Sequence, residues 1–261
     1  MIEESFLLKR IMEPRPPIQE IIDISYPVTS FGDINKARVL TVGINPSSRE
    51  YFQTGAKAQP LPLGKKRLVD SETLDIGPGS EINLAEAKEV LDGNNNYFAK
   101  SGNPYHWFNL IEQYALAPIG ASYFDGSAAH VDIVQWATDP IWSEIQSVDS
   151  REKLIQADAF FLNQIFAMGE WDLVIVNGRQ VYQTMREARL FKLFELEQPV
   201  VAGKKRMFWN GKAQNSPLVA WSVNIQQSRT GTETREYCSG WINNQLRRIQ
   251  SDEFQNWFKS N

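Results

Sequence analysis

The sequence predicts an α/β protein, a three-layer α/β/α sandwich built around a mainly parallel four-stranded sheet. Short runs rich in β-branched residues recur along the chain, and helical stretches lie between them. The strongest of these runs is almost continuously apolar, as a strand buried on both faces of a parallel sheet must be. The chain has 261 residues, which favours a single domain, 1–261, with added segments.

The predicted sheet consists of four strands, each about as long as a typical strand. The first is 37–43, and the others are 130–136, 171–176 and 218–225. The clearest helix is 151–168, where apolar side chains recur on one face; Ser150 can cap its start and Gly169 can end it. Further amphipathic helices are expected at 178–190, 105–116 and 236–249.

Two segments lie outside this regular pattern. The chain before residue 30 is expected to form an N-terminal helical extension. Residues 53–102 form a long insertion with Gly/Pro-rich turns, a short helix at 84–91 and a turn at 93–96. Irregular segments of this length inside a compact domain are usually functional.

Composition excludes several classes of protein. Hydrophobic residues make up 42% and charged residues 22% of the chain, which argues against disorder, collagen-like repeats and coiled coils. Cys238 is the one cysteine, so an internal disulfide is excluded, and two histidines leave too few ligands for a Cys/His zinc site. No apolar run is long enough to span a bilayer and no signal-peptide pattern opens the chain, so a cytoplasmic protein is expected.

The net charge of the chain says less about which classes of partner it binds. The net charge of −4 does not by itself indicate a nucleic-acid-binding protein. A whole-chain value can nevertheless hide a local basic face. No membrane partner is expected, and the oligomeric state is left open.

Polar residues follow each predicted strand. In an open α/β sheet, ligands bind outside the carboxyl ends of the strands, so the loops there carry the information about function. These loops are rich in amides and lack Walker, G-x-S-x-G and dinucleotide-binding motifs. Such a set suits hydrogen-bond recognition of a flat polar ligand; the loops are 43–46, 132–136, 177–179 and 224–231.

The segment Val42–Pro46 (VGINP) resembles the first motif of the uracil-DNA glycosylase superfamily. Its mismatch-specific and single-strand-selective branches have G-I-N-P or G-M-N-P after the first strand. Later segments follow in the family's order over roughly residues 37–250: the aromatic segment 103–108, the strand 130–136, the strand and turn 174–179, and the segment 224–229. The resemblance implies a uracil-DNA glycosylase-like fold and hydrolysis of an N-glycosidic bond in DNA, with no metal and no cofactor.

The resemblance also implies roles for individual residues. Asn45 would position the attacking water, with Gly43 and Ile44 beside the base. Asp132 stands where the family usually has an asparagine that binds the base edge. The family's second motif usually begins His-Pro-Ser, whereas this chain has no histidine there; the substitute donors would be Asn224, Gln226 and Gln227.

A flipped base is usually clamped by an aromatic ring, and Tyr51 or Phe52 stands at a suitable distance after Asn45. Serine and arginine side chains could bind the flanking phosphates, with 204–206 extending a basic rim. This predicted phosphate-binding set is Ser47, Ser48, Arg179, Ser228 and Arg229.

Structural explanations compete with these roles. Asn45–Ser47 could be a plain turn, with Ser47 and Glu50 forming a capping box. Asp132 could cap a helix or pair with an arginine, and Tyr51 and Phe52 could be core residues. His106 and His130 are expected to be structural, and the basic runs 65–67 and 204–206 are often only solvated faces.

The favoured function is therefore a DNA glycosylase acting on a flipped base. Asp132 as a carboxylate can only accept hydrogen bonds, so the sequence predicts a cytosine-like or modified base in preference to uracil. Two alternatives stay open: a catalytically inactive nucleobase- or nucleic-acid-binding protein of the same fold, and a small-molecule enzyme on a Rossmann-like sheet.

Overall fold

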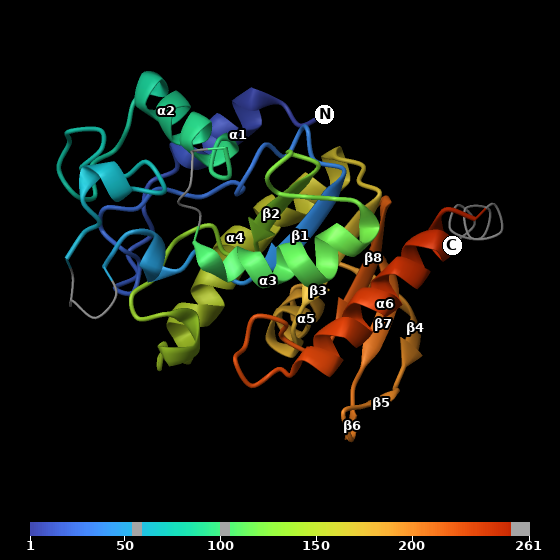
Figure 1. Ribbon diagram of the computed structural model, residues 1–261. Coiled ribbons are helices and arrows are strands. Elements are labelled where there is room, and N and C mark those ends of the chain that lie inside the picture. The colour runs from blue at the N-terminus through green and yellow to red at the C-terminus, as the bar shows by residue number, and fades with distance from the viewer. Residues whose placement is uncertain (54–58, 100–104, 252–261) are drawn as a thin grey trace.

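The computed structural model describes residues 1–53, 59–99 and 105–251 (Figure 1). Four parallel strands lie side by side in the sheet in the order β2-β1-β3-β8. Their bounds are Val39–Gly43 for β1, Ala128–Asp132 for β2, Leu173–Asn177 for β3 and Ser216–Trp221 for β8. The predicted α/β class and the mainly parallel sheet are confirmed.

The prediction of four strands is wrong, because the sheet has six. β7 (Phe208–Ala213) and β4 (Lys192–Glu197) continue the sheet beyond β8 in antiparallel pairing. β4 is an edge strand that mixes charged and apolar residues, so it lacks the continuous apolar pattern of a central strand. Two short strands, β5 (Val200–Val201) and β6 (Lys204–Lys205), form a separate antiparallel pair.

Helices cover both faces of the sheet and make three layers (Figure 1). Leu40 and Val42 of β1 share a hydrophobic cluster with residues of α1 (Glu4–Ile11), α4 (Val148–Met168) and α5 (Arg179–Glu187). Val39, which points to the other face, belongs to a cluster with α6 (Thr232–Ile249). This alternation along one strand is what burial between two helical layers requires.

Four helices differ from their predicted bounds, and one of them, α5, covers only Arg179–Glu187 of the predicted 178–190. α4 begins three residues early, and the Ser147 side chain, not Ser150, accepts the capping hydrogen bond, from the Ser150 backbone N–H. α6 also begins earlier than predicted. α2 (Leu84–Asn95) starts at a capping box of Asn83 and Glu86 and continues through most of the predicted 93–96 turn.

The predicted helix 105–116 is a series of short helical segments. A 3-10 turn at His106–Phe108 leads into α3 (Asn109–Ile111), a π-helical segment at Glu112–Leu116 and a 3-10 turn at Ala117–Ile119. Other 3-10 turns occupy Ser48–Glu50, Leu63–Lys65 and Trp142–Glu144. Residues 103 and 104 of the expected aromatic segment lie outside the described residues.

Only α1 is helical in the N-terminal extension. The rest runs beside the end of β2, where the Val28 N–H donates to the Gln135 carbonyl (2.9 Å) and Phe31 and His130 exchange backbone hydrogen bonds. The contact replaces a further strand at this edge of the sheet. It also brings Phe31 to the carboxyl end of β2.

A buried ion pair fastens α1 to the domain. Nη2 of Arg10 donates to Asp158 Oδ1 of α4 at 2.6 Å, and Asp158 Oδ2 accepts from the backbone N–H of Gln135 at 2.7 Å. Both charged side chains are almost completely buried. One carboxylate thus joins α1, α4 and the segment that follows β2.

The described parts of the insertion 53–102 contribute to the core. Apolar side chains of α2 and of the segment before it join the cluster that contains α1 and α4. Lys66 forms a buried ion pair with Asp70 and a second pair with Glu72. No helix among the described residues is long and apolar enough to cross a membrane.

Candidate functional site

A cavity of about 800 Å³ lies at the carboxyl ends of the four parallel strands. This volume is within the range of small-molecule sites in proteins. The predicted site residues that line it come from all four strand ends: Gly43, Ile44, Asn45, Ser47, Asp132, Arg179, Asn224, Gln227 and Arg229. The rule that ligands bind outside the carboxyl ends of the strands thus locates the cavity correctly.

Asn45 is held by its amide nitrogen. Nδ2 donates to Thr138 Oγ1 at 3.0 Å and to the Pro46 carbonyl at 3.1 Å. Among the described residues, Oδ1 makes no hydrogen bond. The bonds at Nδ2 therefore fix the amide plane and leave an acceptor for a water in the cavity.

The backbone around Asn45 is held by an extension of the β1–β2 pairing. The N–H of Ile133 donates to the Gly43 carbonyl at 3.2 Å, and the N–H of Val134 donates to the Ile44 carbonyl at 2.8 Å. Gly43 pairs directly with Asp132 in the parallel register. A Cβ at Gly43 would overlap Asp132 Oδ1 and the His130 ring, so glycine is needed there to admit the carboxylate.

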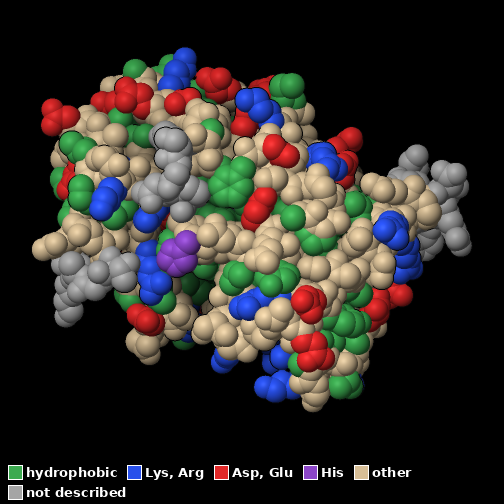
Figure 2. Space-filling model, in the orientation of Figure 1, with side chains coloured by type: hydrophobic (Ala, Val, Ile, Leu, Met, Phe, Trp, Pro, Cys, Tyr) green, Lys and Arg blue, Asp and Glu red, His purple; other side chains and the backbone are tan. Residues whose placement is uncertain are grey.

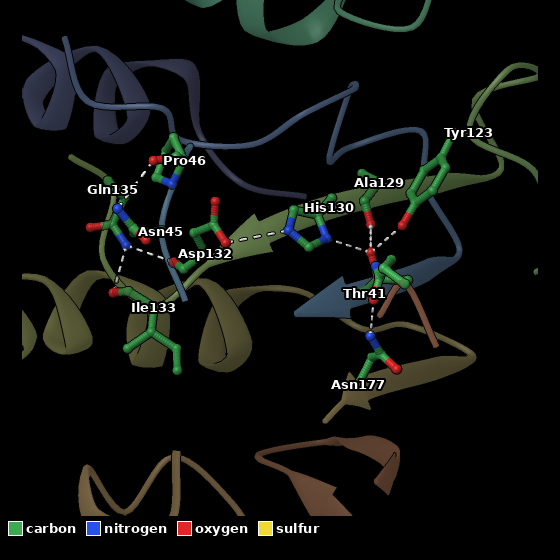
Figure 3. Close-up of polar contacts among 11 residues, drawn as sticks. Thr41, Asn45, Pro46, Tyr123, Ala129, His130, Asp132, Ile133, Gln135 and Asn177 are labelled. Atoms are coloured by element: carbon green, nitrogen blue, oxygen red, sulfur yellow. Dashed lines mark hydrogen bonds and ion pairs between the residues drawn. The ribbon is translucent and has the colours of Figure 1, made fainter. Parts of the chain in front are cut away.

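Asp132 ends a chain of buried polar contacts that crosses β1 and β2 (Figure 3). His130 Nε2 lies 3.3 Å from Asp132 Oδ1, and His130 Nδ1 lies 2.7 Å from Thr41 Oγ1. The Tyr123 hydroxyl lies 2.5 Å from Thr41 Oγ1. Asp132 is 4% exposed, so this chain fixes a carboxylate in the cavity wall.

Glu50 lines the cavity but is not among the predicted site residues. The capping box with Ser47 is wrong: the Ser47 hydroxyl accepts from the Arg49 N–H, and Glu50 turns inward to 2% exposure. The Tyr97 hydroxyl donates to Glu50 Oε2 at 2.8 Å. Burial raises the pKa of Glu50 to about 7, against the lowering effects of the Tyr97 hydrogen bond and of Arg67.

The β3 and β8 ends are tied by Asn177. Its Oδ1 accepts from Trp221 Nε1 at 2.8 Å and from the Ile225 N–H at 3.2 Å, and its Nδ2 donates to Gln226 Oε1. Asn177, Asn224 and Gln227 line the cavity. Two other predicted residues, Gln226 and Ser228, do not line the cavity. Gln226 turns toward Asn177, and Ser228 lies in the exposed part of the loop.

Tyr51 and Phe52, the predicted stacking residues, are not in the cavity wall. Tyr51 is 1% exposed and Phe52 packs against the same hydrophobic cluster. The 3-10 turn at Ser48–Glu50 points Glu50 toward the cavity and leaves the next residues to the core. The aromatic side chains that do line the cavity are Phe31, Tyr105, Trp107, Phe108 and Trp142.

Part of this aromatic wall could have been predicted from the sequence, since Tyr105, Trp107 and Phe108 are clustered there. No sequence pattern indicated Phe31, because it reaches the cavity only through its pairing with His130. Phe31, Trp107 and Phe108 pack against the His130 ring at centroid distances of 5.2 to 5.7 Å.

Three exposed arginines, Arg49, Arg179 and Arg229, stand at the cavity. Ser47 lines it and Ser48 does not. Lys204 and Lys205 are exposed on β6 and are absent from the cavity lining. Figure 2 shows acidic and basic side chains interspersed over the face in view, with no continuous basic surface there.

Comparison with models of known protein families and with curated proteins gave no match for this chain.

Proposed function

We propose that the protein hydrolyses the N-glycosidic bond of a base extruded from DNA. The observation that carries the proposal is the convergence of Asn45, Asp132 and Asn224, from three separate strand ends, on one cavity with an aromatic wall. The resemblance of the Val42–Pro46 segment to the first uracil-DNA glycosylase motif supports the same function.

The reaction builds positive charge on the sugar and negative charge on the departing base. Asn45 Oδ1 is placed to orient a water, because both hydrogen bonds of its amide come from Nδ2. Asn224 and Gln227 supply side-chain amides that can donate to a base oxygen, more weakly than the charged imidazole of the family's usual second motif. Release of the base is therefore expected to be slow.

A panel of oligonucleotides tests this function. Single- and double-stranded substrates carrying uracil, cytosine, 5-methylcytosine or other modified bases are incubated with the protein, and alkali then cleaves any abasic site. Strand cleavage that depends on the protein supports a glycosylase. Binding without cleavage would indicate the inactive nucleobase-binding alternative, and the absence of both would favour the small-molecule enzyme.

Asp132→Asn should shift base preference toward uracil. The carboxylate accepts from an exocyclic amine and repels a ring carbonyl, whereas an amide can both donate and accept. The change should alter discrimination by about 1–3 kcal/mol, a typical value for a base-edge hydrogen-bonded pair. Single-turnover release from matched cytosine- and uracil-containing oligonucleotides measures it.

Asp172→Asn is the control for this substitution, because Asp172 is exposed, pairs with Arg38 and lies outside the cavity lining. Efficient uracil release by the unmodified protein, unchanged or reduced in Asp132→Asn, contradicts the assignment of Asp132 to the base edge.

Arg229→Ala should weaken nucleic-acid binding about equally for all sequences. It should also reduce the slope of log binding constant against log salt concentration by the equivalent of about one phosphate contact. The Arg229 Nε–H donates to Gln227 Oε1 at 2.7 Å, which orients the guanidinium at the cavity. Binding titrations over a range of salt concentrations give the slope.

Arg247→Ala, at an exposed position of α6 outside the cavity lining, should leave the slope unchanged. A protein with no affinity for single- or double-stranded DNA or RNA at low salt would contradict the nucleic-acid assignment altogether.

A further inference from the structure

Two carboxyl side chains from different elements face the same cavity. Asp132 ends β2, and Glu50 lies in the 3-10 turn five residues after Asn45. The Asp132 carboxylate is bound to His130, which leaves it suited to accept from a fixed donor. The Glu50 carboxyl accepts only one hydrogen bond from the described residues, from the Tyr97 hydroxyl to Oε2. Its Oε1 is thus an acceptor for a mobile proton.

We infer that Glu50 is the general base that deprotonates the water attacking the sugar. This inference rests on the proposed function and adds to it a catalytic residue and a proton path. Asn45 and Glu50 lie five residues apart in the segment after β1 and line the same cavity, so the segment brings a water-orienting amide and a buried carboxyl to one site. Asn45 cannot itself take up the proton, because an amide does not act as a base near neutral pH.

The proposed step conserves atoms and electrons. The water oxygen forms a bond to C1′ of the sugar while the C1′–N bond breaks, and the bonding electron pair leaves with the base. Glu50 Oε1 takes one proton from the water. That proton then passes to the departing base, directly or through solvent, and restores the Glu50 carboxylate. The products are a sugar with a hydroxyl at C1′ and a neutral free base.

The surroundings of Glu50 suit this task. Burial raises its pKa to about 7, where a carboxylate is a stronger base than an exposed one and is still available near neutral pH. The groups that act on it come from several elements. Tyr97 follows α2, Arg67 belongs to the insertion, and Asp132 ends β2; the first two lower its pKa and the last raises it. The other charged or titratable side chains among the described lining residues are Arg49, Tyr105, His130, Arg179 and Arg229.

The pH profile of base release tests the inference. In the unmodified protein, single-turnover release of the base that the panel identifies should rise with pH and level off above an apparent pKa near 7, because the reacting form of Glu50 is ionised. Glu50→Gln keeps the shape of the side chain but cannot take a proton. It should lower release by about 100-fold or more at pH 8 and remove the rise with pH.

Tyr97→Phe gives a second variant that keeps the Glu50 carboxyl. It removes the hydrogen bond that stabilises the carboxylate, so the midpoint of the profile should move to higher pH while release at high pH largely persists. Tyr26→Phe is the control, because Tyr26 is buried in the hydrophobic cluster that contains α1 and α4 and is absent from the cavity lining. Its profile should match that of the unmodified protein.

Stability gives a readout that does not depend on activity. The folded state favours protonated Glu50, so its contribution to stability is complete below pH 4.5 and is lost as pH rises through 7. Denaturant unfolding from pH 4.5 to 8 should show this loss in the unmodified protein and less of it in Glu50→Gln.

The possible outcomes separate the inference from the function on which it rests. Base release whose pH profile is unchanged in Glu50→Gln and Tyr97→Phe overturns the role of Glu50 and leaves the glycosylase proposal standing. Failure to release any base from the panel overturns both.

Discussion

Asn45→Ala is expected to reduce base release by about 100-fold or more while leaving the protein folded. The amide is fixed through Nδ2 by Thr138 and the Pro46 carbonyl. Alanine removes the Oδ1 acceptor that would orient the water, and the lost hydrogen bond to Thr138 should cost only about 1 kcal/mol of stability. Single-turnover release and denaturant unfolding measure the two effects separately.

Asn163→Ala is the matched control. Asn163 is half-buried like Asn45, but it accepts a hydrogen bond from Gln214 and is absent from the cavity lining. A similar small loss of stability with full activity is expected. If correctly folded Asn45→Ala protein instead keeps most of the base-release activity, the proposed hydrolysis mechanism is wrong.

The largest stability effect is expected for Arg10→Ala, at about 3–5 kcal/mol. The substitution leaves the Asp158 carboxylate buried without its cation, although the Gln135 N–H still donates to it. Burial already raises the pKa of Asp158, and loss of Arg10 should raise it further. The deficit should therefore shrink as pH falls and Asp158 becomes protonated.

A double variant tests whether the cost is that of an unpaired charge. Arg10→Met combined with Asp158→Asn keeps an acceptor for the Gln135 N–H and removes both charges, so it should be clearly more stable than Arg10→Ala. Lys153→Ala breaks an exposed ion pair with Asp149 and should cost less than about 1 kcal/mol. An equally small effect for Arg10→Ala would contradict the role given to the buried pair.

The central strands and the position of the cavity could be predicted because a strand covered on both faces has a continuous apolar pattern. β1 and β3 have that pattern, and all five residues of each are buried. β4 could not be predicted in this way, since lysine and glutamate residues interrupt its apolar pattern. Its place in the sheet depends on pairing with β7.

Cavity residues at the end of a strand, or a few residues after it, were predictable, because the strand fixes where they lie. Asn45, Asp132 and Asn224 are of this kind. Glu50 and Phe31 were missed, because each reaches the cavity through a contact with a distant segment: Glu50 with Tyr97, and Phe31 with His130. Tyr51 was predicted to line the site and does not. Its spacing from Asn45 in the sequence indicated an aromatic ring nearby but could not indicate the direction in which that ring points.

Acidic side chains of the cavity are buried, and its arginines are exposed. Glu50 and Asp132 are 2% and 4% exposed, whereas Arg49, Arg179 and Arg229 are exposed at the opening. Above about pH 7, where the Glu50 carboxyl is ionised, the electrostatic potential should therefore change from positive at the mouth to negative in the interior. A nucleotide would be drawn in with its phosphate outward and an amine-bearing base inward. A free phosphate or nucleoside triphosphate would be repelled from the deepest part, so such anions should compete poorly with a polymer held across the entrance.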